Sequence, residues 1–234
     1  MGITDICRMH ILITAATELE IRPLIDWCGK GGVPPGRHRV QWLITGVGLV
    51  ATTHSLMAET AKNRPDLLIQ AGIAGSFRSC RPGTVYQVAE DRIGDQGVWE
   101  NHGFRSVFDL GFAAPDQAPY LGGALPNPYT RLRSLLPLES VRGASVNEIT
   151  TSREKISWYK QHFDPVIESM EGAAFHYVCL LGGLPFLQLR AVSNEVGQRD
   201  KSQWNIPLAV GNLNEQLISL IKLLEPFDET DFRI

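Results

Sequence analysis

The sequence predicts one α/β domain built on a central, mixed and twisted β-sheet that is flanked by helices. Apolar runs of strand length alternate with segments whose apolar residues recur at helical spacing, and this alternation is typical of such sheets. The 234 residues are enough for one domain with a full core. No internal repeat or low-complexity tract divides the chain, so we expect residues 10–224 to form a single domain.

The first half of the chain supplies most of the predicted parallel strands. Apolar runs with turn residues at their ends predict strands over residues 10–17, 40–46, 66–77 and 83–95. Helical spacing predicts helices over residues 18–28 and 49–63. Between the first helix and the second strand, "GGVPPGRH" is a turn-rich break.

The second half begins with a proline-rich stretch, residues 112–137, which predicts a long excursion over the surface. After it we expect strands over residues 141–149, 165–170 and 184–194. Helices are expected over residues 152–163, 171–181 and 207–224. The acidic segment 225–234 predicts a loose C-terminal tail.

Composition excludes several classes of function. Hydrophobic residues make up 44% of the chain and charged residues 20%, and a formal net charge of −3 gives no basic surface for nucleic acid. No apolar stretch reaches the roughly 18 residues that span a membrane, and "MGITDICRM" lacks the apolar core of a signal peptide. The histidines lack metal-ligand spacing. The four well-separated cysteines, Cys7, Cys28, Cys80 and Cys179, predict reduced thiols in a cytoplasmic protein.

A glycine turn, "ITGVGLVA", follows the second predicted strand and opens a helix. Gly46, Gly48 and Ala51 match the G-x-G-x-x-A pattern of dinucleotide-binding folds. That pattern also requires an acid at the end of the next strand, whereas Asp66 precedes its strand. A tight strand–helix turn, or a contact with another kind of ligand, is therefore the favoured interpretation.

Two glutamates each allow a structural and a functional interpretation. Thr17 and Glu20 have the spacing of a capping box, but Glu20 also stands at the exit of the first strand, where a carboxylate could act as a base. Glu171 suits the first turn of a helix through the helix dipole. Small residues beside Glu171 also suit a sugar, whose paired hydroxyls need a strong acceptor.

The strand over residues 184–194 ends in Asn194, at the edge of the sheet where ligands bind in α/β folds. Asparagine also turns a chain by bonding its own backbone, so both interpretations stay open from position alone. In "QAGIAGSF" the small residues Gly72, Ala74 and Gly75 end another strand. They allow either a close approach of a ligand to the backbone or a sharp turn.

In chain order, five segments together resemble the nucleoside phosphorylase and nucleosidase superfamily. They are "ITAATELE", "ITGVGLVA", "QAGIAGSF", "VIESMEGAAF" and "FLQLRAVSN", and they extend over most of residues 10–224. Within this group "RAVSNEVGQRDKSQWNIPLA" is most similar to the futalosine hydrolase family. The resemblance implies a nucleoside phosphorylase-like fold and hydrolysis of futalosine to hypoxanthine and dehypoxanthinyl futalosine, in menaquinone biosynthesis.

The resemblance to methylthioadenosine nucleosidases within this group implies roles for individual residues. Glu20 takes the place of the acid that activates water, and Glu171 the place of the acid that binds the ribose hydroxyls. Met170 is expected to pack on the sugar, and Val146 falls near the position that stacks on the base. Those adenine-acting relatives have an aspartate at the position of Asn194. This difference argues against an adenine nucleoside as substrate and favours a 6-oxopurine nucleoside.

Further contacts with the substrate are expected around these residues. Ala74, Gly75 and Val47 are predicted to line the substrate site, and Trp204 falls at the aromatic position of the 5′-group pocket. The loop that carries Arg199 is predicted to meet the carboxylate of the 5′-substituent. The resemblance implies a nucleoside and water as partners, a homo-oligomer, and neither a metal nor an organic cofactor.

Three other functions stay open from the sequence. A purine nucleoside phosphorylase needs a cationic phosphate cradle, but "AATEL" replaces the family's G-D-P-x-R segment and Arg22 is offset by three residues. The glycine turn leaves a nucleotide-dependent oxidoreductase open. A non-catalytic protein that binds nucleosides or nucleotides is the third, and it would be expected to lack Glu20 or Glu171.

Overall fold

The computed structural model describes residues 9–33, 38–100 and 103–232. Its strands are β1 (Met9–Ala15), β2 (His38–Ile44), β3 (Leu67–Ser76), β4 (Val85–Asp91), β5 (Gly97–Glu100), β6 (Gly103–Ser106), β7 (Leu125–Pro126), β8 (Ser140–Ser145), β9 (Ile167–Ser169) and β10 (Phe186–Glu195). Its helices are α1 (Glu18–Gly29), α2 (Leu49–Lys62), α3 (Thr130–Arg133), α4 (Arg153–His162), α5 (Gly172–Gly182) and α6 (Ile206–Leu224), with a 3₁₀ turn at Lys201–Gln203. Each strand and helix expected from the sequence is present, with ends shifted by a few residues.

The main sheet is mixed, as predicted, and part of it closes on itself. Its strand order is β10-β4-β8-β9-β3-β1-β2, and β10 also pairs with β3. Five strands, β3, β10, β4, β8 and β9, therefore form a closed ring, from which β1 and β2 extend as parallel strands. The pairs β10–β4 and β3–β9 are antiparallel.

Strand β3 has a gap along one of its edges. One edge pairs with β10 from Leu68 to Ser76. The other edge pairs with β1 up to Gln70 and with β9 from Gly75 onward. Between these two partners, residues 71–74 have no strand beside them at that edge in the described part of the chain. The gap lies at the carboxyl end of β1, where α/β folds bind their ligands.

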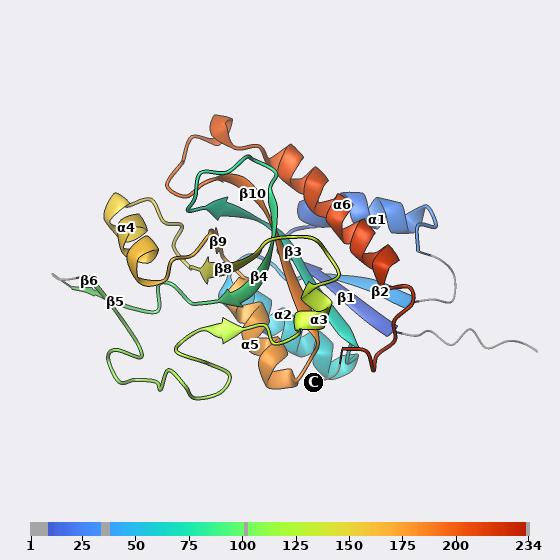
Figure 1. Cartoon of the computed structure of the whole chain (residues 1–234), viewed down its shortest axis with the longest axis horizontal. Coiled ribbons are helices and arrows are strands. Elements are labelled where there is room, and N and C mark those ends of the chain that lie inside the picture. The colour runs from blue at the N-terminus through green and yellow to red at the C-terminus, as the bar shows by residue number, and fades with distance from the viewer. Residues whose placement is uncertain (1–8, 34–37, 101–102, 233–234) are drawn as a thin grey trace, which may run out of the picture.

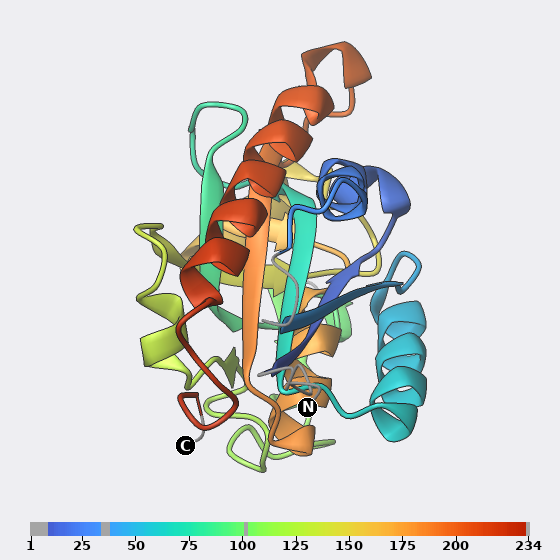
Figure 2. The same ribbon diagram turned by 90° about the vertical axis from the view of Figure 1, so that its right-hand side faces the viewer.

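Helices cover the sheet on both sides (Figures 1 and 2). Helices α1 and α6 pack together on one side, and α2 and α5 pack together on the other. Strand β10 has strands on both edges and helices on both faces, so residues 186–193 are all buried. This double burial explains the long apolar run that predicts the strand.

Three segments differ from the expectations. Strands β5 and β6 pair in an antiparallel arrangement that was not predicted. The stretch 112–137 is not wholly on the surface, because Leu125, Leu132 and Leu136 are buried. The C-terminal segment is not loose over its described part, since Phe232 is 3% exposed and Asp231 pairs with Arg131. Buried apolar side chains of the stretch 112–137 and of the C-terminal segment pack in the core and anchor these two segments.

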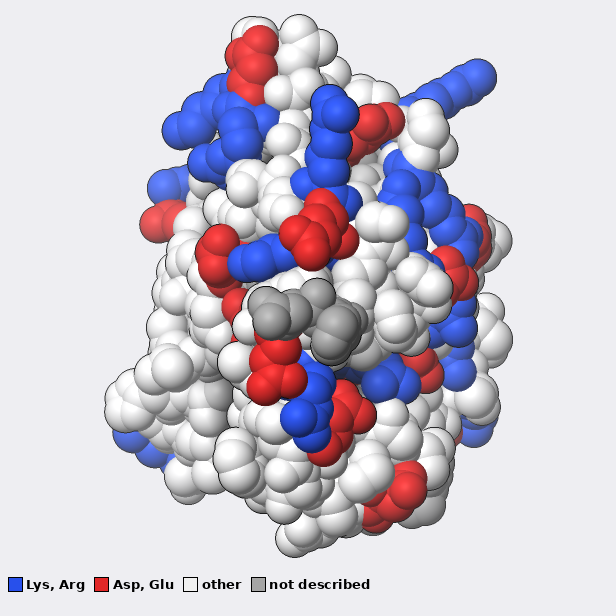
Figure 3. Space-filling view, turned by 90° about the vertical axis from the view of Figure 1, so that its left-hand side faces the viewer, with Lys and Arg blue, Asp and Glu red and all other residues white. Residues whose placement is uncertain are grey.

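Basic and acidic side chains are interspersed over the face of the molecule shown in Figure 3. Over residues 9–33, 38–100 and 103–232, no helix combines the length and the apolar character needed to cross a membrane. Cys28, Cys80 and Cys179 are free thiols, and Cys7 lies outside the described residues.

Candidate active site

A cavity of about 330 Å³ opens at the carboxyl ends of β1, β3, β9 and β10. It lies beside the gap in the edge of β3. Three carboxylates line it, those of Glu20, Glu168 and Glu171, and the described residues that line it include no lysine or arginine. A cavity of this size is within the usual range for a small-molecule site.

Glu20 is buried and has both of its carboxylate oxygens engaged. Its Oε2 accepts hydrogen bonds from the Thr17 amide at 2.9 Å and the Thr17 hydroxyl at 3.0 Å. Its Oε1 accepts from the amide of Ile73 at 3.0 Å, within the gap of β3. The helix-capping role is therefore present, and the same carboxylate also faces the cavity. The two interpretations of Glu20 do not exclude each other.

Glu171 is held by the glycine turn and by an arginine. Its Oε1 accepts from the amide of Gly48 at 3.1 Å, and its Oε2 pairs with Arg190 Nη1 at 3.2 Å. Gly48 has φ +95°, which a side chain would make unfavourable. The amide of Gly48 thus holds the carboxylate of Glu171. This contact agrees with the interpretation that the glycine turn does not bind a dinucleotide.

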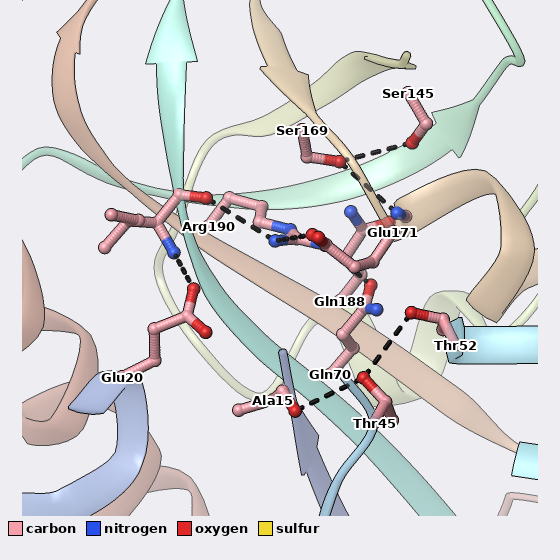
Figure 4. Close-up of polar contacts among 12 residues, drawn as sticks. Ala15, Glu20, Thr45, Thr52, Gln70, Ser145, Ser169, Glu171, Gln188 and Arg190 are labelled. Atoms are coloured by element: carbon pink, nitrogen blue, oxygen red, sulfur yellow. Dashed lines mark hydrogen bonds and ion pairs between the residues drawn. The ribbon is translucent and has the colours of Figure 1, made fainter. Parts of the chain in front are cut away.

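Arg190 is a site residue to which the sequence assigned no role. Its side chain is 1% exposed, and its guanidinium also donates to Gln70 Oε1 at 3.0 Å and to the Ile73 carbonyl at 3.4 Å. In Figure 4 the Arg190 guanidinium lies between strand β3 and the Glu171 carboxylate. An arginine in an otherwise apolar strand is the sequence signal that marks it, because a buried charge requires a partner.

The gap in β3 is thus filled by side chains in place of a strand. Ile73 donates its N–H to Glu20 and accepts from Arg190 through its C=O. A Cβ at Gly72 would overlap Arg190 Nη1 and would come within 3.0 Å of Glu20 Oε1. Glycine at position 72 is therefore required for the two charged groups to meet the backbone here.

Asn194 follows a bulge in β10. The pairing with β3 shifts between Val192 and Asn194, so Ser193 is an extra residue in the strand. In a regular strand Ser193 and Asn194 would point to opposite faces, but here both line the cavity. Asn194 Oδ1 accepts from the Ser193 hydroxyl at 2.7 Å, and its Nδ2 donates to the Glu195 carbonyl at 2.8 Å. The bulge turns the amide of Asn194 toward the cavity.

The remaining predicted residues divide into two groups. Five of them line the cavity with Glu20, Glu171 and Asn194: Met170, Ala74, Gly75, Val47 and Trp204. Two do not. Val146 is fully buried in a cluster with Phe77 and Tyr159, and Arg199 lies over the ring of Trp204, 5.6 Å from its centre.

Sequence reasoning also missed two residues on the wall of the cavity, Ile149 and Glu168. Ile149 lines the cavity three positions after Val146, which is itself not part of the lining. For Glu168 the available signal was a carboxylate inside a short apolar strand, three residues before Glu171.

A buried polar network supports the start of the helix that follows Glu171. Ser145 accepts from the amide of Ala173 at 2.8 Å and donates to Asp91 at 2.9 Å. Gln188 also donates to Asp91, at 3.2 Å. Burial raises the pKa of Asp91 from its ordinary value of 3.8 to about 6, despite these hydrogen bonds and the nearby Arg190. Ionisation of Asp91 therefore lowers the stability of the folded state.

Asp91→Asn should therefore change how stability depends on pH. A buried acid with a raised pKa binds its proton more tightly in the folded protein, so the stability it contributes is lost as pH rises through about 6. The two units of pKa correspond to about 3 kcal/mol. Relative to wild type, the variant should gain about that much free energy of unfolding between pH 4 and 7, measured by urea titration.

Asp109→Asn is the matched control for this experiment. Asp109 is exposed, and its hydrogen bonds with Ser106 lower its pKa, so its replacement should shift stability with pH in the opposite direction. A difference between Asp91→Asn and wild type that stays constant with pH would contradict the account of Asp91.

The comparison with protein families matches residues 11–225 to the phosphorylase superfamily. The chain belongs to the phosphorylase superfamily. Its sequence is 30% identical to a futalosine hydrolase of Streptomyces coelicolor, over 93% of this chain and 97% of that protein. A futalosine hydrolase of Thermus thermophilus is 29% identical, over 74% of this chain and 76% of its own length. These relatives confirm the resemblance found in residues 190–209.

Solved structures of this superfamily share the fold. A methylthioadenosine/S-adenosylhomocysteine nucleosidase of Streptococcus pneumoniae, bound to a transition-state inhibitor, superposes with a TM-score of 0.74 at 21% identity. That match covers 92% of this chain and all of the other. A mutant futalosine hydrolase of Helicobacter pylori has a TM-score of 0.76 at 18% identity, over 91% and 98% of the two chains. The predicted nucleoside phosphorylase-like fold is confirmed.

Proposed function

We propose that this phosphorylase-superfamily protein hydrolyses the N-glycosidic bond of futalosine, releasing hypoxanthine and dehypoxanthinyl futalosine in menaquinone biosynthesis. Two kinds of observation support the proposal. The relatives named futalosine hydrolase match most of the chain, and the carboxylates of Glu20 and Glu171, which the proposed mechanism uses, line one cavity.

One observation favours water over phosphate as the acceptor. The described residues that line the cavity carry three carboxylates and no basic side chain. Arg190 is already paired with Glu171, and Arg22 is exposed and paired with Glu18. A phosphate dianion would therefore meet uncompensated negative charge, whereas a neutral water molecule would not. This charge pattern carries the choice of a hydrolase over a phosphorylase.

In the proposed mechanism, one glutamate activates the water molecule and another binds and stabilises the sugar. Cleavage passes through an oxocarbenium-like sugar. Glu20 takes a proton from a water molecule placed below the anomeric carbon, since its carboxylate faces the cavity from the end of β1. Glu171, fixed by Gly48 and Arg190, accepts hydrogen bonds from the ribose hydroxyls and stabilises the positive charge that grows on the sugar.

Asn194 is proposed to bind the leaving base. Once a water molecule has protonated N7 of the departing hypoxanthine, the carbonyl of Asn194 can accept from that N7–H, and its NH₂ can donate to O6. Both groups have only local partners, Ser193 and the backbone of Glu195, which the base can replace. The apolar side chains of Trp204, Ile206 and Val210 also line the cavity and are available to the 5′-substituent. The mechanism uses no metal or organic cofactor.

The acceptor can be tested directly. We expect hypoxanthine release from futalosine at the same rate with and without phosphate in the buffer, because Glu20 occupies the side from which phosphate would attack. The measurement is free hypoxanthine by chromatography, together with the sugar product. A rate that scales with phosphate and yields a sugar 1-phosphate would overturn the assignment as a hydrolase.

Asn194→Asp should change the preference between bases. Wild type should favour futalosine over its 6-amino analogue mainly in turnover, because an amide has no acidic proton to give to N7 of adenine. The aspartate should narrow or reverse that preference by about 1–3 kcal/mol, the cost of one mispaired buried polar contact. The measurement is the ratio of kcat/KM for the two nucleosides in each protein.

Asn205→Asp is the matched control for this change. Asn205 caps helix α6 through Leu208, and aspartate caps a helix equally well. The ratio should not move in this control. If it does not move in Asn194→Asp either, Asn194 serves only to shape the end of the strand.

We also propose that the protein is cytoplasmic and forms a homo-oligomer. Support for an oligomer comes from apolar side chains that remain exposed on α2, where Val50 is 81% and Met57 55% exposed. Val47, at the start of the same region, is 57% exposed and lines the cavity. A second copy packed here would cover these side chains and the adjoining side of the cavity.

A further inference from the structure

Glu168 is a buried carboxylate in the wall of the cavity that the proposed mechanism does not use. It belongs to β9 and is 7% exposed. One of its oxygens, Oε1, accepts from the amide of Thr150 at 3.1 Å. The other, Oε2, is buried and has no hydrogen-bond partner within the described part of the chain. Burial is the largest influence on the pKa of Glu168 and raises it.

An unpaired buried acceptor is costly, and native proteins rarely keep one without a reason. A hydrophobic residue would serve β9 better if the position had only to pack. Because Glu168 lines the cavity, a donor on the bound ligand can supply the missing hydrogen bond. The question is which donor lies within its reach.

The sheet places Glu168 and Asn194 on either side of one residue of β3. Glu168 pairs with Gly75 from β9, and Asn194 pairs with the same Gly75 from β10. Adjacent strands lie about 4.8 Å apart, so the two backbones are about 10 Å apart, a distance that a purine and two side chains can fill. Gly75 itself has no side chain to block the space between them.

Glu171 and Glu168 therefore serve different parts of the cavity. Glu171 is tied to Arg190, which contacts Ile73, whereas Glu168 pairs two residues further along β3, with Gly75, the same residue that pairs with Asn194. The ribose end and the base end of the cavity are thus ordered along β3. A donor for Glu168 is to be sought on the base.

A hypoxanthine nucleoside has one N–H donor on its base, at N1, next to the C6 oxygen that Asn194 is proposed to bind. We propose that Glu168 accepts the hydrogen bond from N1–H and is a specificity-determining residue for 6-oxopurines. The inference rests on the proposed function and extends it. Adenine carries a lone pair at N1 and would face the Glu168 carboxylate with like polarity. In this proposal Asn194 contacts O6 and N7 of the base, and Glu168 contacts N1.

The test is the binding of free bases, measured by calorimetry at neutral pH. Glu168→Gln should bind hypoxanthine about ten- to a hundredfold more weakly than wild type, because an amide accepts less strongly and its NH₂ can face N1–H. Adenine and unsubstituted purine should bind the variant as well as or better than wild type, since the NH₂ can donate to N1. Glu195→Gln is the control, as Glu195 is exposed and follows Asn194 directly.

Each outcome decides the inference. An equal loss for all three bases would assign Glu168 a structural role only, and unchanged hypoxanthine binding would remove it from the site. If the variant does not fold, 1-methylhypoxanthine is tested on wild type. It lacks N1–H, so it should bind at least about tenfold more weakly than hypoxanthine, and equal binding would overturn the proposal.

These measurements separate the inference from the proposed function. If Glu168→Gln shows the expected loss of hypoxanthine binding but wild type does not cleave futalosine, the proposed substrate is wrong and the role of Glu168 stands. If wild type cleaves futalosine while Glu168→Gln binds every base unchanged, the function stands and the role of Glu168 is wrong. A wild-type protein that binds no hypoxanthine overturns the inference.

Discussion

Glu20→Gln should lower the turnover number for futalosine by about a hundredfold or more, because general-base catalysis supplies at least that factor. The amide keeps the size and shape of the side chain, so KM should change little. The measurement is steady-state hypoxanthine release by wild type and variant. A turnover number within a few-fold of wild type would contradict the role of Glu20 as the base.

The structure adds a second expected effect of the same substitution. Both oxygens of Glu20 accept hydrogen bonds, from Thr17 and from Ile73, and a glutamine must turn its NH₂ toward one of these donors. The free energy of unfolding should fall by about 1–3 kcal/mol as a result. Glu18→Gln is the control, because Glu18 lies in the same helical turn but is exposed. It should change neither turnover nor stability appreciably.

Arg190→Met should destabilise the fold by about 3–5 kcal/mol, because it leaves the buried Glu171 carboxylate without its partner. Gln70 and the carbonyl of Ile73 lose a donor at the same time. The measurement is the free energy of unfolding from urea titration, and turnover should fall as well because Glu171 is no longer fixed.

The double variant Glu171→Gln with Arg190→Met distinguishes a lost charge partner from lost packing. Removing the carboxylate charge together with the arginine should recover part of the stability, since no uncompensated buried charge remains. If the double variant is as unstable as the sum of the two single variants, the ion pair contributes nothing specific and Arg190 acts by its volume.

Much of the fold could be predicted from the sequence because its signals are local. Apolar runs and helical spacing locate every strand and helix that was predicted to within a few residues, although β5, β6, β7 and α3 were not predicted. The ring formed by β3, β10, β4, β8 and β9 could not be predicted, because pairing between distant strands leaves no local signal. The buried anchors of the C-terminal segment were missed for a similar reason, since two phenylalanines in an acidic stretch do not reveal what they pack against.

The site was predicted where a motif stands directly at the end of a strand. Glu20, Glu171 and Asn194 meet in one cavity because the ends of β1, β9 and β10 lie around β3. Val146 and Arg199 lie outside the cavity lining, and their contacts with the base and the 5′-substituent stay predictions. The unpaired oxygen of Glu168 is a property of three-dimensional packing, so no sequence pattern reveals it.

The gap in the edge of β3 makes one backbone amide a reporter of the site. The N–H of Ile73 is not held by a neighbouring strand but by a side chain, Glu20. Its rate of exchange with deuterated solvent should therefore follow the state of the Glu20 side chain, whereas the amides of Leu68 and Ile69 follow opening of the sheet. A ligand that fixes Glu20 would slow exchange at Ile73 and at Thr17, the two amides that donate to this carboxylate, and these amides would record occupancy of the cavity.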